Sequence, residues 1–157
     1  MKVLFMCTAN SCRSVLSEGL FNHLAPAGFS AVSSGSFPSG RLNPIAVQTL
    51  EGLDIDTSGL YSKGSETFAS NPPDIVITVC DKASGEPCPV FFGPSIKSHW
   101  GLADPSDVVG SADHVQAAFD ATVAQIRRRL DAFFRLEPNA LSPAQLKQAL
   151  DQIGEIQ

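Results

Sequence analysis

Residues 1–28 read MKVLFMCTANSCRSVLSEGLFNHLAPAG, and this stretch decides the fold. The apolar run from Lys2 to Met6 is typical of a fully buried strand. After Ser14, leucines recur at helical spacing until the turn residues at 26–28 end the pattern. A strand, a short loop and a helix in this order predict the beginning of an α/β fold.

The rest of the chain continues this alternation. Strands are expected at residues 31–33, 74–79 and 96–100, and helices over 111–136 and from the Asn43-Pro44 and Ser142-Pro143 pairs. Residues 57–70 are polar and ambiguous, and residues 81–95 are rich in glycine and proline and predict a long loop. No internal repeat or linker divides the chain. We therefore predict an α/β fold with a single parallel twisted sheet and helices on both faces.

Composition and charge exclude several classes of protein. The chain has 157 residues and a net charge of −5, which favours one globular domain over a nucleic-acid binder. The basic run Arg127-Arg128-Arg129 lies within a predicted helix, so we interpret it as a solvated helix face rather than a binding patch. No apolar run is long enough to predict a transmembrane helix.

The beginning of the chain has one positive charge and an apolar stretch too short for a signal peptide, so we expect a cytoplasmic protein. Thiols stay reduced in that compartment. The cysteines Cys7, Cys12, Cys80 and Cys88 are then expected to serve catalysis or metal binding rather than structural disulfides.

The loop between the first strand and helix combines a nucleophile with an anion cradle. Five residues separate Cys7 from Arg13, at the carboxyl end of a strand, where open α/β sheets bind ligands. Backbone N–H groups at the helix N-terminus point at an oxyanion bound there, and Arg13 supplies a planar fork for two of its oxygens. The same positive field favours the thiolate of Cys7, and Ser14 is placed to hydrogen-bond its sulfur.

Other candidate residues keep two interpretations at this point. Asp104 before Pro105 is either a general acid or an ordinary turn aspartate. Cys80 and Cys88 are redox residues, packing residues or part of a zinc site, although the chain has too few histidines at suitable spacing for zinc. Cys12 is interpreted as a small packed thiol within the loop.

Three motifs carry a resemblance to a known family. The opening MKVLFMCTANSCRS resembles the low-molecular-weight protein tyrosine phosphatase fold. The sequences VITVCD ending near Cys80, Cys88-Pro89, and HWGLADP at residues 99–105 resemble its arsenate reductase branch. The resemblance covers residues 1–136, as a phosphatase-like catalytic domain, and leaves residues 137–157 as a C-terminal helical extension.

The resemblance implies specific roles. Cys7 would be the nucleophile, Arg13 the oxyanion clamp and Asp104 the general acid, while Cys80 and then Cys88 would carry the oxidation away as a disulfide. The expected ligands are arsenate, phosphate or sulfate, and the expected reductant is thioredoxin, or alternatively glutathione with glutaredoxin. The oxyanion-binding residues would be Thr8, Ala9, Asn10, Ser11, Cys12, Arg13 and Ser14.

The resemblance also raises the question of an ion. Some members of the family bind potassium near residues equivalent to Asn10, Glu18 and Ser33, although this sequence has no clear match for a further acidic ligand. No other cofactor or metal is expected. Ala9 stands where a glycine is common, which would strain any positive φ at that position.

The main alternative function is a low-molecular-weight protein tyrosine phosphatase, which needs Cys7, Arg13 and Asp104 but not Cys80 or Cys88. A protein that binds phosphate without turnover is a second alternative. It would have no use for a nucleophile, an acid and a reducible pair together. The sequence therefore favours an arsenate reductase.

Overall fold

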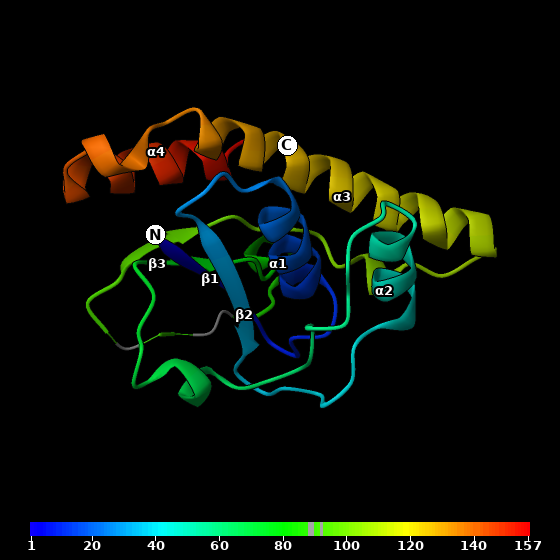
Figure 1. Ribbon diagram of the computed structural model, residues 1–157. Helices are drawn as coiled ribbons and strands as arrows, with labels where there is room; N and C mark the ends of the chain where they lie inside the picture. Colours follow the sequence, from blue (N-terminus) through cyan, green and yellow to red (C-terminus); the bar gives the residue numbers. More distant parts are fainter. Residues whose placement is uncertain (88–89, 92) are drawn as a thin grey trace.

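A computed structural model describes residues 1–87, 90–91 and 93–157 of the chain. Its centre is a parallel sheet in the order β2-β1-β3-β4 (Figure 1). The strands are β1 (Lys2–Cys7), β2 (Ser30–Gly35), β3 (Ile75–Thr78) and β4 (Ile96–His99). The predicted single parallel sheet is confirmed, with strand bounds shifted by one or two residues at most sites.

The α-helices follow the predicted positions. They are α1 (Arg13–Leu24), α2 (Pro44–Glu51), α3 (Ala112–Phe134) and α4 (Pro143–Gly154). Short 3-10 helices lie between them: η1 (Ser65–Phe68), η2 (Lys82–Ser84), η3 (Pro105–Asp107) and η4 (Pro138–Ala140). The Asn43 side chain accepts hydrogen bonds at the start of α2, and Ser142 forms a capping box with Gln145 at the start of α4. The two proline-led helix starts are therefore confirmed.

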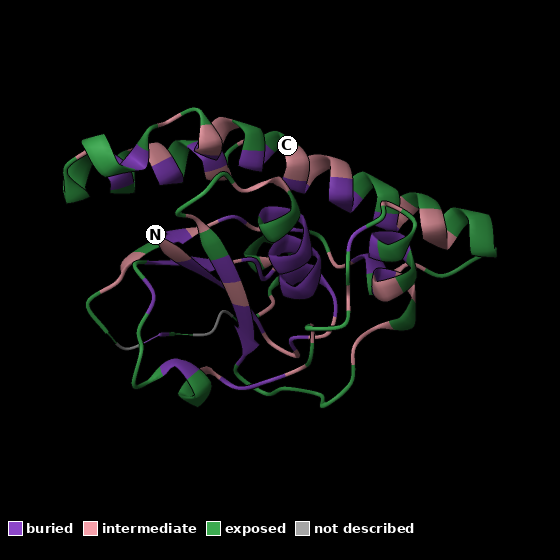
Figure 2. Cartoon of the chain, in the orientation of Figure 1, coloured by how far each residue is buried: buried purple, intermediate pink, exposed green. Residues whose placement is uncertain are grey.

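Alternate residues of β1 enter two different cores. Val3 and Phe5 pack into the large core that all of the α-helices share. Leu4 and Met6 face the other side, where Phe68 of η1 helps to cover them. In Figure 2 the buried residues of α3 lie along the side that faces the sheet, and the exposed residues lie on its outer side. Among the described residues, the helical cover that packs on this second cluster comes from the 3-10 helix η1.

The C-terminal segment packs on the same core as the sheet. Leu146, Leu150 and Ile153 of α4 are buried in it, and the Trp100 indole Nε1 donates to the Leu150 carbonyl over 2.9 Å. The apolar face of α4 is therefore covered within this chain. The domain boundary at residue 137 stays a prediction. In the structure Leu136 and Leu141, on either side of it, pack against the same core.

The basic run in α3 requires a correction. Arg128 is exposed and Arg127 is partly buried, but Arg129 is only 2% exposed. Its guanidinium donates to the carbonyls of Gly101, Gly154 and Ile156, and burial lowers its pKa to about 10. The prediction of a solvated face was wrong for Arg129, because the chain terminus folds back over it and supplies backbone acceptors.

Within the described residues, no helix combines the length and apolar character needed to cross a membrane.

Candidate active site

The loop between β1 and α1 wraps around a common centre. The carbonyls of Thr8, Ala9 and Ser11 accept hydrogen bonds from the N–H groups of Phe37, Ser39 and Asn43, which lie outside the loop. In a trans peptide unit the following N–H points opposite to the carbonyl. The N–H groups of residues 9, 10 and 12 are thereby directed toward the inside of the loop. This is the arrangement that binds a tetrahedral oxyanion.

Cys7 is the last residue of β1 and lies at this centre. It is 3% exposed, and its Sγ lies 2.9 Å from the Ser14 Oγ and accepts a hydrogen bond from the Asn10 N–H at 3.3 Å. The predicted contact between Ser14 and the sulfur is therefore confirmed. One contact comes from the loop and the other from the first turn of α1, so the sulfur is held where the loop N–H groups converge.

The strain expected at Ala9 occurs one residue later. Asn10 has φ +48°, and Ala9 is not among the described non-glycine residues with positive φ. Asparagine tolerates the left-handed region better than most residues. Gly35, at the end of β2, is needed for a different reason: a Cβ atom there would lie 2.5 Å from the Thr8 carbonyl oxygen. Close approach of β2 to the loop thus requires a glycine.

The side chain of Asn10 organises the interior of the loop through hydrogen bonds. Its Nδ2 donates to Ser14 Oγ and to Ser33 Oγ, each over 2.9 Å. Ser33 Oγ donates in turn to Glu18 Oε1 over 2.7 Å, and Asn10 Oδ1 accepts from the Lys63 N–H over 2.9 Å. These buried groups connect the nucleophile's hydrogen-bond partner to α1 and β2.

The same network tests whether the predicted potassium fits. Asn10, Glu18 and Ser33 do lie together, but the Lys63 Nζ is 3.5 Å from Glu18 Oε1 and donates to the Tyr61 carbonyl. Both charged side chains are at least nine-tenths buried. The positive charge beside Glu18 therefore comes from the chain itself, and these residues fit a potassium ion poorly.

Arg13 projects into the mouth of the loop. Its side chain is 6% exposed, and its Nη1 also donates to the Leu102 carbonyl over 3.2 Å. The buried Nε has no partner among the described residues. A buried N–H without an acceptor is costly, so it identifies a position where an oxyanion oxygen is expected.

Glu86 is a contact that the sequence analysis missed. Its carboxylate accepts from Arg13 Nη1 at 2.6 Å and from Nη2 at 2.7 Å, in a bidentate pair. It also accepts from Thr8 Oγ1 at 3.2 Å and from the Asp81 N–H at 2.8 Å. The hydrogen bond from Arg13 lowers the pKa of Glu86 to about 2, although burial opposes the shift. The only signal in the sequence was an acidic residue within the loop that follows Cys80.

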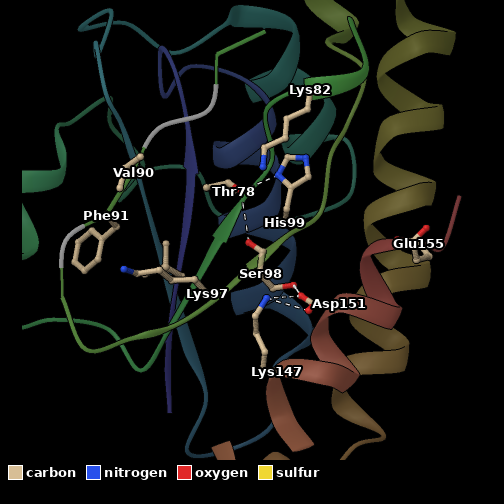
Figure 3. A pocket seen from close by; sticks show the side chains of 11 residues that line it. Thr78, Lys82, Val90, Phe91, Lys97, Ser98, His99, Lys147, Asp151 and Glu155 are labelled. Atoms are coloured by element: carbon tan, nitrogen blue, oxygen red, sulfur yellow. Dashed lines mark hydrogen bonds and ion pairs between the residues drawn. The ribbon is translucent and has the colours of Figure 1, made fainter. Parts of the chain in front are cut away.

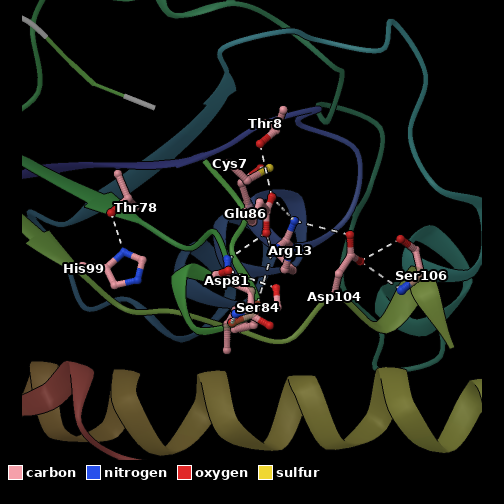
Figure 4. Close-up of polar contacts among 12 residues, drawn as sticks. Cys7, Thr8, Arg13, Thr78, Asp81, Ser84, Glu86, His99, Asp104 and Ser106 are labelled. Carbon is pink, nitrogen blue, oxygen red and sulfur yellow. Dashed lines mark hydrogen bonds and ion pairs between the residues drawn. The ribbon is translucent and has the colours of Figure 1, made fainter. Parts of the chain in front are cut away.

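Asp104 has the contacts of a turn aspartate and also lies beside Arg13. Its Oδ1 accepts from the N–H and Oγ of Ser106, which is typical of a turn. Its Oδ2 lies 3.3 Å from Arg13 Nη2 (Figure 4). The turn therefore fixes a carboxyl group at the mouth of the loop, where a general acid for a departing oxygen is required.

Cys80 follows β3 at the same edge of the sheet as Cys7. β1 and β3 are parallel neighbours, and the Val79 N–H donates to the Met6 carbonyl over 2.8 Å. Cys80 is fully buried and disulfide-bonded, whereas Cys7 and Cys12 are free thiols. Cys88, which was predicted to complete the relay, lies outside the described residues.

Cys12 is 4% exposed, and burial, followed by the charge of Asp104, raises its pKa. It therefore stays a protonated thiol, unlike a nucleophile.

Another cavity lies elsewhere, and its described lining does not include the loop residues. Its volume is about 680 Å³, and it opens between the end of β4 and α4 (Figure 3). His99 lines it and hydrogen-bonds Thr78 Oγ1 over 2.7 Å, while Lys147 and Asp151 form an ion pair at its edge. Among the described residues, its lining includes no cysteine and no loop that wraps around an oxyanion site, so the chemistry points to the Cys7 loop.

Comparison with known proteins agrees with this geometry. The chain matches the family described as low molecular weight phosphotyrosine protein phosphatase over residues 2–151. It is 32% identical to the arsenate reductase of Bacillus subtilis over 131 residues, which cover 83% of this chain and 93% of that protein. It is 38% identical to the glutaredoxin arsenate reductase of Synechocystis over 104 residues, which cover 66% and 78%.

A solved structure described as an arsenate reductase in the phosphate binding state is also similar. It superposes with a TM-score of 0.62 at 28% identity, covering 83% of this chain and 96% of that one. The likeness thus extends over nearly the whole of the known structure.

Proposed function

Because the chain belongs to the low-molecular-weight phosphotyrosine protein phosphatase family and, within it, to the arsenate reductases, we propose that it converts arsenate to arsenite in arsenic detoxification. The observation that carries this proposal is the placement of a disulfide-bonded Cys80 beside the loop that holds Cys7 and Arg13. A phosphatase needs the loop and an acid, but it has no use for a redox-active cysteine at the neighbouring strand.

The first step uses the loop as in phosphoryl transfer. The inward N–H groups and Arg13 hold arsenate, and the Cys7 thiolate attacks arsenic. Asp104 gives a proton to the departing oxygen, which leaves as water. The product of this step is an arsenic(V) adduct on the Cys7 sulfur. Phosphate or sulfate is expected to occupy the same cradle, because each is a tetrahedral oxyanion.

The second step is the reduction. The Cys80 thiolate attacks the Cys7 Sγ, the sulfur–arsenic bond breaks, and its electron pair stays on arsenic, which leaves as arsenite. Cys88 then attacks Cys80 and releases Cys7 as a thiolate. Two thiols are thereby oxidised to one disulfide while arsenic gains two electrons, so the electrons balance.

The remaining disulfide requires an external reductant. We assign thioredoxin, because an internal disulfide is reduced by exchange with a dithiol in a reducing compartment such as the cytoplasm. Glutathione with glutaredoxin is the alternative, and a relative from Synechocystis is named for glutaredoxin.

The test is arsenate-dependent NADPH oxidation in two coupled assays. One contains thioredoxin and thioredoxin reductase, and the other contains glutathione, glutaredoxin and glutathione reductase. Turnover in the thioredoxin assay supports the proposal, and turnover only in the second assay replaces the reductant. No arsenate-dependent turnover in either assay, with hydrolysis of a phosphate ester intact, would identify a phosphatase instead.

A further inference from the structure

The oxyanion clamp is already occupied by a carboxylate of this chain. Arg13 Nη1 and Nη2 both donate to Glu86, whose carboxylate also accepts from Thr8 at the rim of the loop (Figure 4). We propose that Glu86 is an internal competitor for oxyanions, which keeps Arg13 engaged while Cys80 is disulfide-bonded and releases it on reduction. This inference rests on the proposed function, because it concerns the oxidised enzyme at the end of a turnover.

The geometry of the pair makes it a competitor. A planar guanidinium binds a carboxylate and a tetrahedral oxyanion in the same way, through two parallel N–H groups. The two kinds of ligand therefore compete for the same N–H groups of Arg13. In this structure the two terminal nitrogens are taken, and the Nε remains without a partner among the described residues. An oxyanion that uses the full fork of Arg13 must therefore displace Glu86.

The charges at the mouth strengthen the effect. A cavity of about 320 Å³ opens there, and its lining includes the carboxyl groups of Asp81, Glu86, Asp104 and Asp107. Arg13 is in contact with two of them, at 2.6 Å and 3.3 Å. A dianion entering this cavity meets several like charges at short range, so its binding is disfavoured until Glu86 leaves.

Glu86 is tied to the backbone next to Cys80. The Asp81 N–H, directly after Cys80, donates to the Glu86 carboxylate over 2.8 Å, and the Glu86 N–H donates to the Asp81 carbonyl over 3.1 Å. Gly85, with φ +88°, forms the left-handed turn that aims Glu86 at the loop. Because Cys80 is oxidised here, this closed turn belongs to the disulfide state. Reduction would remove this covalent constraint next to Asp81, and the proposal is that the turn then releases Glu86.

Such a competitor has a clear use in the proposed cycle. If arsenate reacted with Cys7 while Cys80 was still oxidised, the thiol that the proposed relay uses to reduce the adduct would not be available. Glu86 prevents this by making oxyanion binding follow reduction of the disulfide.

The experiment measures binding of inorganic phosphate by calorimetry, to the oxidised full chain and to the chain reduced with excess phosphine. The proteins are wild type, Glu86→Gln, Glu86→Asp and, as a matched control, Asp107→Asn. Asp107 lines the same acidic cavity, but no contact with Arg13 is described for it. Circular dichroism checks folding of each variant.

We expect oxidised wild type to bind phosphate about tenfold or more weakly than the reduced protein. Glu86→Gln should remove most of that ratio by tightening the oxidised form, Glu86→Asp should remove part of it, and Asp107→Asn should change affinity less than about twofold. Equal affinity of both redox states in wild type overturns the proposal. Equal effects of Glu86→Gln and Asp107→Asn on phosphate affinity also overturn it, because the effect would then come from the lost negative charge and not from the contact between Glu86 and Arg13.

Phosphate binding is measured without arsenate turnover, so the two proposals fail separately. A chain that reduces no arsenate but shows the Glu86 effect disproves the reductase and leaves the internal competitor standing.

Discussion

Two neighbouring loops at the same edge of the sheet are held in very different ways. The Cys7 loop has buried hydrogen bonds to β2, to α1 and to the segment before α2. Residues 81–87 are mostly exposed, and their described hydrogen bonds with the rest of the chain are all made by Glu86. Low local contact favours local opening. In the proposed function, the Cys7 loop is the preorganised half that binds the oxyanion, and residues 81–87 belong to a movable half that carries the oxidation.

The largest effect is expected from removing the Cys7 nucleophile from the first loop. Cys7→Ser should abolish both arsenate reduction and phosphate-ester hydrolysis, by a factor on the order of 10⁴ or more, because both reactions begin on this sulfur. Coupled turnover and a chromogenic phosphate ester measure the two losses. In wild type, iodoacetamide should alkylate Cys7 first, and phosphate should protect it. Retention of either activity in the variant would remove Cys7 from that reaction.

The two loops can also be separated genetically. Cys80→Ser and Cys88→Ser should each eliminate multiple-turnover arsenate reduction while ester hydrolysis stays within about threefold of wild type, because an ester is cleaved by the anion-binding half alone. The measurement is the same pair of assays with both variants. Full reductase turnover in either variant would show that an external thiol attacks the Cys7 adduct directly.

The rigidity of the first loop can be tested through its buried ion pair. Lys63→Met leaves the Glu18 carboxylate buried without its partner, and should lower the free energy of unfolding by about 3 kcal/mol in urea denaturation. Lys147→Met is the matched control, because its pair with Asp151 is about half exposed, and it should cost less than about 1 kcal/mol.

The same denaturation measurement tests whether the loop network binds potassium. Wild type should unfold at the same denaturant concentration in potassium chloride and in sodium chloride, since Lys63 supplies the cation beside Glu18. A stabilisation of wild type that is specific to potassium would show that the loop network binds the ion after all.

The smallest expected effect is the pH dependence of stability that comes from His99, which lines the cavity of about 680 Å³. Burial, together with the charge of Lys82, lowers the pKa of His99 below its ordinary value of 6.5. The neutral ring is therefore favoured in the folded state, and stability is fully present above pH 6.5 and falls as the pH drops toward the lowered pKa. His99→Gln should flatten this part of the profile of unfolding free energy against pH. If the slope of unfolding free energy against pH is the same in His99→Gln as in wild type, the pH dependence comes from other groups.

The sequence predicted the first loop better than the second, for a physical reason. Local spacing and the position between a strand and a helix place Cys7, Arg13 and Ser14 together, and the structure confirms that placement. Residues that act through long-range contacts have no such signal. Lys63 reaches Glu18 across 45 positions and Glu86 reaches Arg13 across 73, so only the folded chain reveals them.

The burial of Arg129 is also a long-range effect that the sequence pattern did not predict. In the sequence it belongs to a charged run on a helix, but three backbone carbonyls from two distant segments surround it. Its burial depends on how the end of the chain folds back, which helical periodicity does not contain.

In the proposed mechanism, oxidation passes from Cys7 to Cys80 and then to Cys88, out of the Cys7 loop and into the segment that follows β3. The most direct measurement oxidises the reduced protein with a single turnover of arsenate, digests it without reduction, and maps the disulfide by mass spectrometry. The account predicts a bridge between Cys80 and Cys88, with a change in hydrogen exchange concentrated in residues 81–95. A dominant Cys7–Cys12 bridge, or a glutathione adduct in place of any internal bridge, would contradict it.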